Sequence, residues 1–274
     1  MAMEPPLKAL TLWRYPWNRI VLLAVSLLLL GWLVNTPAGL LGKADAIGYA
    51  VCHRIDLRSF YLGDRQLPLC ARCNGMYLGA MLGLAYQAAL GSRRGGTPPK
   101  RVLAAAAALG LAFVVDGVNS FTSFYSPDAW LYQPQNWLRL ATGTGMGLLI
   151  SVALFPAFNQ TVWKNWEPRP ALSSLRTFAG LLTISLVLIL LVLSENPLLL
   201  YPLALISAAG VLVLLSMVYC MLWLMVTRSE NSYLKIPELF LPLTAGFGLA
   251  LMQVALLDVA RFWLTGTWDG FRLG

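Results

Sequence analysis

One segment of the 274-residue sequence gathers the residue types that carry out metal or thiol chemistry. Three of the four cysteines and the only histidine fall between Cys52 and Cys73. Cys52 is followed directly by His53, and Cys70 and Cys73 form a Cys-x-x-Cys pair where we expect a helix to begin. The free backbone amides and the dipole of a helix N-terminus stabilise a negative sulfur. The pattern therefore indicates either metal ligation or thiol–disulfide exchange.

The number of cysteines within reach favours a metal. Cys220 lies in a long apolar stretch, about 33 Å from its outer end at a rise of 1.5 Å per residue, so it cannot reach the other three. The remaining set, three cysteines and one histidine, is the Cys3His set of a closed tetrahedral zinc site. A relay of electrons to a quinone would instead need a second cysteine pair on the same face. We predict a zinc site with these ligands: Cys52, His53, Cys70 and Cys73.

Other interpretations of the cysteines remain open. Neighbouring residues of an extended segment point to opposite sides, so Cys52 and His53 share one ion only if the chain turns there. A first alternative is a membrane thiol–disulfide oxidoreductase that uses Cys70 and Cys73, with a quinone or a thiol protein as its partner. A second alternative is a non-enzymatic transporter or assembly factor in which a metal or a disulfide only staples the loop.

Charged residues near the ends of several apolar stretches add a candidate catalytic group. Asp116 and Arg139 are expected at the same level as the cysteines, and ionisable groups at membrane depth usually line a cavity or form pairs. We predict Asp116 as a general base, with Arg139 or Arg58 holding an anionic headgroup, if a bound metal activates water. As ion pairs we expect Asp116 with Arg139, and Asp258 with Arg261.

The same residues carry a resemblance to a known family. The chain reads Cys52-His53 with Arg58-Ser59-Phe60, and then Pro68-x-Cys70-x-Arg72-Cys73-x-Gly75-x-Tyr77. Further along it has Asp116-Gly117 and Arg139-x-x-Thr142-Gly143. In these motifs the chain resembles a family of predicted prokaryotic membrane proteins of unknown function. The resemblance implies no established activity. It implies that the functional residues are Cys52, His53, Arg58, Cys70, Arg72, Cys73, Asp116 and Arg139.

The elements that must position these residues are membrane helices. Apolar residues make up 58% of the sequence and charged residues only 12%, about half the share of a soluble domain. Several stretches approach the roughly 20 apolar residues that cross a bilayer. We predict one all-α, polytopic membrane domain with about seven transmembrane helices and an outer Cys/His loop at 37–71. The predicted spans lie near 18–36, 72–91, 101–121, 136–158, 172–194, 198–226 and 238–264.

Two of these spans carry small residues at regular spacing. Gly75, Gly79 and Gly83 recur every four residues in one span, and Gly143 and Gly147 repeat the interval in another. Small residues at this spacing allow helix backbones to approach closely. We therefore expect close helix packing, which would hold Cys73 rigidly beside the span near 101–121 or the span near 136–158.

Basic residues are unevenly divided between alternate loops. The short segment Arg93–Arg101 holds four of them and no acidic residue, which is typical of a cytoplasmic loop. We predict an inner-membrane protein with a cytoplasmic N-terminus, and with its C-terminus and Cys/His loop outside. The formal net charge of +8 then follows from topology and requires no nucleic-acid partner. The expected partners are the lipid bilayer and a lipid or quinone ligand.

Overall fold

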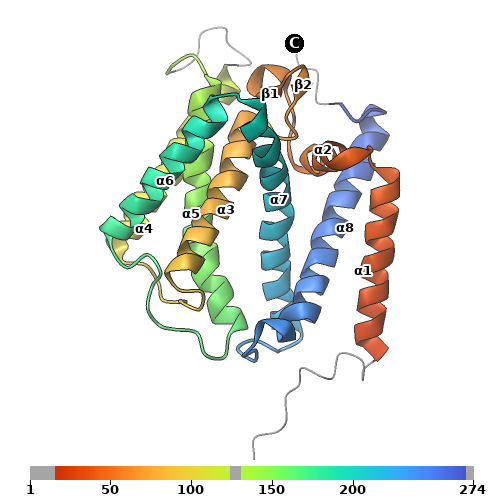
Figure 1. The fold of residues 1–274 in the computed structure, drawn as a ribbon, viewed down its shortest axis with the longest axis vertical. Coiled ribbons are helices and arrows are strands. Elements are labelled where there is room, and N and C mark those ends of the chain that lie inside the picture. Colours follow the sequence, from red (N-terminus) through yellow and green to blue (C-terminus); the bar gives the residue numbers. More distant parts are fainter. Residues whose placement is uncertain (1–15, 124–130, 270–274) are drawn as a thin grey trace, which may run out of the picture.

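A computed structural model describes residues 16–123 and 131–269 of the chain (Figure 1). The described part is almost entirely helical, with one short hairpin of strands β1 (Tyr61–Leu62) and β2 (Arg65–Gln66). The helices, in chain order, are α1 (Pro16–Asn35), α2 (Gly39–Val51), α3 (Ala71–Leu90), α4 (Lys100–Thr122), α5 (Asn136–Val162), α6 (Leu175–Leu193), α7 (Pro197–Val226) and α8 (Phe240–Thr265). Two 3-10 turns, η2 (Asp56–Arg58) and η3 (Ile236–Leu239), complete the fold.

Six helices in the described ranges are long and apolar enough to cross a membrane. They are α1, α4, α5, α6, α7 and the segment Ile236–Thr265 that ends with α8. Because a bilayer offers no water to backbone N–H and C=O groups, such segments must satisfy them within helices. The prediction of an all-α, polytopic membrane protein is confirmed.

The seventh long helix, α3, is the least apolar of the set and lies inside the bundle. Its 20 residues span about 30 Å, which matches a hydrocarbon core. It carries Asn74 and Gln87, both buried, and the Gln87 amide donates to the Ser151 carbonyl oxygen of α5 at 2.9 Å. Because neighbouring helices shield these polar groups from lipid, α3 needs less apolar character than its neighbours. That α3 crosses the bilayer stays a prediction.

The segment expected as a polar loop contains a helix. Helix α2 has 13 residues, too few to cross a bilayer, and lies across the ends of α7 and α8 (Figure 1). Its buried side includes Ala46, Ile47 and Tyr49. The sequence prediction missed α2 because a helix of 13 residues is too short to give a transmembrane signal, whereas packing against other helices stabilises it.

Helices α3 and α5 form the tightest pair in the bundle. A Cβ added at Gly79 would stand 2.5 Å from the Thr144 carbonyl oxygen, and one at Gly83 would overlap the Ser151 side chain. The contacts follow one another in the same order along both helices, so the two run parallel and begin at the same end. The close approach expected from the glycine spacing is confirmed.

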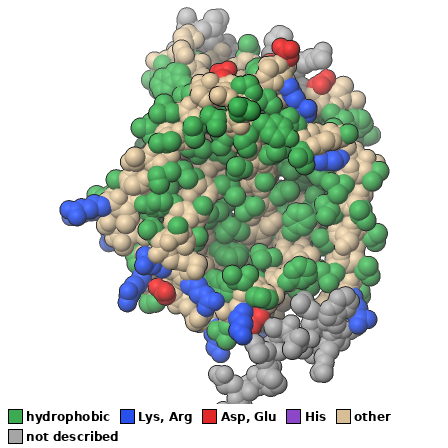
Figure 2. Space-filling model, viewed as in Figure 1, with side chains coloured by type: hydrophobic (Ala, Val, Ile, Leu, Met, Phe, Trp, Pro, Cys, Tyr) green, Lys and Arg blue, Asp and Glu red, His purple; other side chains and the backbone are tan. Residues whose placement is uncertain are grey.

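The two ends of the bundle differ in character. The loops after α3, α5 and α7 meet at one end, where the Arg93 side chain donates to Asn165 and to the Leu234 carbonyl oxygen. Lysine and arginine side chains gather at this end, and hydrophobic side chains cover the middle of the visible face (Figure 2). Cys220 packs here with Val162 and Leu239, far from the other cysteines, as predicted. The N-terminus of α3 lies at the opposite end (Figure 1).

Candidate functional site

The three clustered cysteines meet at the start of α3. The Sγ atoms of Cys52, Cys70 and Cys73 all lie within 4.8 Å of one another. Cys70 is the N-cap of α3 and Cys73 lies in its first turn, whereas Cys52 follows directly after α2. The structure thus brings the Cys52 sulfur to those of Cys70 and Cys73, which follow it by 18 and 21 positions in the sequence.

Helix α2 brings Cys52 to this place. Gly48, one turn before Cys52, lies so close to Pro68 that a Cβ at position 48 would overlap the Pro68 carbonyl. The missing side chain lets the end of α2 rest directly on the segment that leads into α3. As a result the Cys70 backbone N–H points at the Cys52 sulfur at 3.3 Å, and the Arg54 N–H does so at 3.4 Å.

Hydrogen bonds within the cluster shift the pKa values of the Cys70 and Cys52 thiols in opposite directions. Hydrogen bonds from Cys52 and Cys73, together with the backbone N–H groups of Cys73 and Arg72, hold the pKa of Cys70 well below its usual range. The hydrogen bond to Cys70, together with burial, raises the pKa of Cys52 to about 12. Of these two thiols, that of Cys70 therefore ionises more readily.

His53 is not one of the ligand atoms in this group. Cys52 is buried in an extended conformation, and the side chain of His53 is exposed. The chain turns one residue later, at Arg54, which has a positive φ of 51°. The two neighbours therefore point to different sides, as their adjacency in an extended segment dictates. A role for His53 as the fourth ligand stays a prediction.

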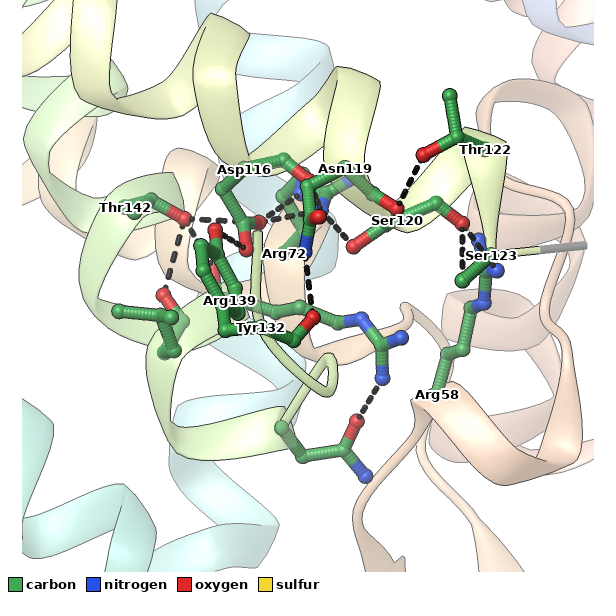
Figure 3. A network of polar contacts seen from close by, with 12 residues as sticks. Arg58, Arg72, Asp116, Asn119, Ser120, Thr122, Ser123, Tyr132, Arg139 and Thr142 are labelled. Atoms are coloured by element: carbon green, nitrogen blue, oxygen red, sulfur yellow. Dashed lines mark hydrogen bonds and ion pairs between the residues drawn. The ribbon is translucent and has the colours of Figure 1, made fainter. Parts of the chain in front are cut away.

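Beside the cysteines, Asp116 of α4 is the centre of a polar network (Figure 3). Its buried carboxylate forms an ion pair with the Arg72 guanidinium, whose Nε donates to Oδ2 at 3.1 Å. The Tyr132 hydroxyl donates to Oδ1 at 2.9 Å, and the Thr142 hydroxyl donates to Oδ2 at 3.2 Å. Three side chains, those of Arg72, Tyr132 and Thr142, thus converge on one carboxylate that is 1% exposed.

The predicted ion pair between Asp116 and Arg139 was wrong. Asp116 pairs with Arg72 of α3, not with Arg139 of α5. Thr142, which is nearly one turn deeper in α5 than Arg139, occupies the position that faces Asp116. The Arg139 guanidinium instead donates a hydrogen bond to Oδ1 of Asn136 at 2.8 Å.

Arg58 reaches the same network from η2. Its guanidinium donates to the Ser120 carbonyl oxygen at 2.8 Å, and the Ser120 hydroxyl accepts a hydrogen bond from Arg72 at 2.9 Å. Burial, followed by the charges of Arg139 and Arg72, lowers the pKa of Arg58 to about 10. The three arginines therefore lie within electrostatic range of one another.

The second predicted pair, Asp258 and Arg261, attract each other by charge, but each side chain also binds another group. Asp258 of α8 accepts a hydrogen bond from the Trp32 indole at 3.0 Å. Arg261 donates to the carbonyl oxygens of Tyr49 and Cys52 at 2.5 and 2.6 Å. Because Arg261 follows Asp258 by three residues, both leave the same side of α8, but Arg261 extends towards the end of α2. Arg261 therefore holds the backbone that carries Cys52.

Sequence reasoning gave no role to several members of the network. Asn119 joins α4 to the segment before α5, since its amide donates to the Tyr132 carbonyl oxygen at 2.8 Å and its Oδ1 accepts from the Leu131 N–H. Asn119 and Ser120 follow Asp116 by about one helical turn, which was the available signal. Tyr132 gave no such signal, because aromatic residues at that level usually anchor the membrane interface.

The comparisons with known proteins concern the same part of the chain. Residues 52–153 match the model of a family described as predicted membrane protein (DUF2085). Over these residues the chain is similar to that family. The match begins at Cys52 and ends within α5, so it includes the cysteine cluster, Arg58, Asp116 and Arg139 and leaves out α6, α7 and α8. The resemblance to a membrane protein family of unknown function is confirmed.

The chain is also similar to two uncharacterized archaeal proteins. An uncharacterized protein of Methanocaldococcus jannaschii is 25% identical over 122 residues, which cover 44% of this chain and 72% of that protein. An uncharacterized protein of Methanothermobacter thermautotrophicus is 29% identical over 103 residues, which cover 37% of this chain and 82% of that protein. No solved structure matches the chain.

Proposed function

We propose that this protein is a membrane metalloprotein whose functional centre is a zinc ion held by Cys52, Cys70 and Cys73. The observation that carries the proposal is the convergence of the three sulfur atoms within 4.8 Å. A tetrahedral zinc ion with Zn–S bonds of about 2.3 Å separates its sulfur ligands by about 3.8 Å. Thiolates are soft ligands that select zinc over magnesium or calcium.

The surroundings suit a bound cation. Deprotonation of three thiols concentrates negative charge, and a divalent ion offsets most of it. The start of α3 and the backbone N–H groups that face the Cys52 sulfur orient the ligands before a metal binds. Helix packing between α3 and α5 holds Cys70 and Cys73 in place.

The fourth coordination position decides the role of the metal. If His53 turns inward, the shell closes as in a structural site; if water or a substrate occupies the position, the ion can act as a Lewis acid. Asp116 is unsuited to act as a free base because Arg72, Tyr132 and Thr142 already bind its carboxylate. In this proposal Asp116 positions Arg72 beside the cysteine cluster.

The distribution of basic residues between the two ends of the bundle supports one side of the membrane for the metal centre. The end of the bundle formed by the loops after α3, α5 and α7 is basic, which favours the cytoplasmic side for it. The cysteine cluster lies at the other end and would then face the outside of the inner membrane.

Metal analysis of the purified full chain tests the proposal. We expect stoichiometric zinc in the wild type and in Cys220→Ser, whose cysteine lies at the opposite end of the bundle. Cys70→Ser and Cys73→Ser should lose it. His53→Ala distinguishes the two shells, because a closed Cys3His site loses affinity whereas a three-cysteine site keeps its metal. Wild-type protein without a stoichiometric metal would refute the proposal.

A second candidate function is thiol–disulfide exchange through Cys70 and Cys73. The low pKa of Cys70 at a helix N-terminus favours it, because the thiolate is the attacking species. Alkylation with a mass-tagged maleimide after graded reduction separates the two functions. A redox pair titrates as a unit between oxidised and reduced forms, whereas zinc ligands become reactive only after chelation.

A further inference from the structure

Asn74 carries a buried amide without a hydrogen-bond partner in the described part of the chain. The residue is 1% exposed, and both Oδ1 and Nδ2 of its side chain are unpaired there. Buried polar groups in proteins are almost always hydrogen-bonded, because an unmet donor or acceptor loses its hydration without compensation. Exceptions in a stable fold concentrate at functional sites.

A second buried amide on the same helix shows how the bundle satisfies such a group. Gln87 of α3 is also 1% exposed, and its Nε2 donates to the carbonyl oxygens of Gly83 at 3.1 Å and Ser151 at 2.9 Å. Asn74 lies near the other end of α3, one residue after Cys73. The unpaired amide is therefore next to the cysteine cluster, and the paired amide is far from it.

Asn74 shares a helix face with a cysteine. It follows Cys70 by four residues, the interval that places two side chains one above the other on a helix. Side chains of a helix lean towards its N-terminus, so the Asn74 amide lies over the turn that holds Cys70. The next residue, Gly75, faces α5, since a Cβ there would overlap the Leu140 carbonyl oxygen. Asn74 therefore lies on the side of α3 that turns from α5 towards the cysteines.

The other neighbours of Asn74 on this side of α3 are apolar. Ala71 and Leu78, three residues before it and four after it, belong to a buried cluster of apolar side chains. Leu200 and Ala204 of α7 complete that cluster at the level of Asn74. The groups beside Asn74 that can bind a polar ligand are therefore the cysteine sulfur atoms.

A zinc ion with three cysteine ligands requires one more. Zinc is almost always four-coordinate in closed protein sites, and it accepts oxygen ligands as well as sulfur and nitrogen. Three thiolates already exceed the charge of the ion, so a neutral fourth ligand adds no further charge to this buried place. The amide oxygen of asparagine is such a neutral ligand, as its use in calcium sites shows. The side chain of His53, the alternative, is exposed.

We propose that Asn74 is the fourth ligand of the metal centre, bound through its amide oxygen Oδ1 together with Cys52, Cys70 and Cys73. This inference rests on the proposed zinc centre and names the group that completes it. An amide oxygen is a weaker ligand of zinc than a thiolate, so an incoming water or substrate can take this position. The centre then has three permanent ligands and one exchangeable ligand, which is the arrangement of a catalytic zinc site.

Two substitutions at position 74 test the role of the amide in the purified full chain. Asn74→Leu keeps the branched shape and removes both polar atoms, whereas Asn74→Asp keeps an oxygen at the same place. Gln87→Met is the matched control, because it removes the other buried amide of α3. Four properties are measured for each protein: zinc content, zinc affinity in competition with a chromophoric chelator, the absorption spectrum after loading with cobalt(II), and the unfolding midpoint without metal.

The expected results for Asn74→Leu and Gln87→Met are opposite. Asn74→Leu should weaken zinc binding by about tenfold or more and change the ligand-field bands of bound cobalt. Its metal-free unfolding midpoint should equal or exceed that of the wild type, because no polar group remains unmet. Gln87→Met should keep the zinc affinity and lower the midpoint, because its hydrogen bonds to Gly83 and Ser151 are lost. A purely structural role of Asn74 would not produce this pattern.

Asn74→Asp separates ligation from a hydrogen bond to sulfur. A carboxylate oxygen can replace the amide oxygen as a ligand, so this variant should bind zinc more tightly than Asn74→Leu. If Asn74 instead donates Nδ2–H to a thiolate, the carboxylate lacks the N–H and repels the sulfur. Asn74→Asp would then bind zinc more weakly than Asn74→Leu, and that order of affinities overturns the ligand role.

Failure of this inference can be distinguished from failure of the zinc centre. Wild-type protein with stoichiometric zinc, combined with an unchanged affinity in Asn74→Leu, overturns the role of Asn74 alone. Loss of zinc in His53→Ala without loss in Asn74→Leu also overturns it and assigns the fourth position to His53. Wild-type protein without a stoichiometric metal overturns the zinc centre and this inference together. If Asn74→Leu does not fold, Asn74→Ala removes the amide without added bulk and takes its place in each comparison.

Discussion

Gly143 of α5 lies directly against the backbone of Arg72 in α3. A Cβ at position 143 would overlap the Arg72 carbonyl oxygen and stand 3.2 Å from its Cα. The two residues thus join the start of the helix that carries Cys70 and Cys73 to the start of the helix that carries Arg139. This backbone contact holds the cysteine cluster next to the first turn of α5.

We predict that Gly143→Ala destabilises the bundle by roughly 1–3 kcal/mol, because the helix backbones must separate to accept the methyl group. Thermal unfolding in detergent measures the change. Gly117→Ala in α4 is the control, since a Cβ there meets nothing within 4 Å. Alanine is the better helix former, so Gly117→Ala should be neutral or slightly stabilising. Equal effects of the two substitutions would contradict close packing at Gly143.

Asp116→Asn should cost about 3–5 kcal/mol, the range for breaking a buried ion pair, because Arg72 keeps a charge that loses its partner. Glu167→Gln removes a surface pair instead, in which Arg94 lies 4.0 Å away and both side chains are partly exposed. Its expected cost is about 0–1 kcal/mol. The unfolding midpoints of both variants test the difference.

The double variant Arg72→Gln/Asp116→Asn tests whether the unpaired Arg72 charge causes the destabilisation expected for Asp116→Asn. Removal of both charges leaves no unpaired buried ion, so its destabilisation should be smaller than the sum of the two single changes. A strictly additive result would mean that Arg72 and Asp116 act independently, contrary to their ion pair.

Removal of the metal should lower the stability of the wild type. A ligand bound only by the folded state contributes to stability, and structural zinc contributes strongly. We expect a membrane-permeant zinc chelator to lower the unfolding midpoint of the wild type and of Cys220→Ser, and to leave Cys73→Ser unchanged. A chelator effect of equal size in Cys73→Ser would place the metal elsewhere.

The orientation in the membrane is testable with introduced cysteines. Arg65 is exposed at the cysteine end, and Arg169 is exposed in the loop between α5 and α6 at the basic end. In intact cells, Arg65→Cys should react with an impermeant maleimide and Arg169→Cys should react only after lysis. The opposite pattern would place the metal centre in the cytoplasm, where reducing conditions disfavour a disulfide and favour a metal.

Much of the site was predictable because it is local in sequence. Cys70, Arg72 and Cys73 lie together at the start of one helix, and backbone N–H groups of Cys73 and Arg72 there help to lower the pKa of the Cys70 thiol. The contribution of Cys52 could be inferred from the count of cysteines within reach. The exposed position of His53 follows from its adjacency to Cys52, which the sequence already flagged as an obstacle to shared ligation.

The choice of ionic partners was not predictable, because it depends on how far each helix is rotated and shifted along its neighbour. Asp116 is near both Arg72 and Arg139, and the shift between α4 and α5 places Thr142 where Arg139 was expected. The same reasoning applies to Asp258, whose partner Trp32 comes from α1, 226 residues away. A long arginine side chain can reach several acidic or carbonyl groups, so the spacing of residues in the sequence does not determine which pair forms.

By itself, the sequence determined that this protein is a bundle of membrane helices with a cysteine group at one end, because hydrocarbon requires apolar helices and because the cysteines are close along the chain. Only the tertiary structure decided that α2 presses Cys52 onto Cys70, that Arg72 pairs with Asp116, and that Arg139 keeps a buried donor unused. These contacts join separate helices, and backbone packing at glycines sets their register.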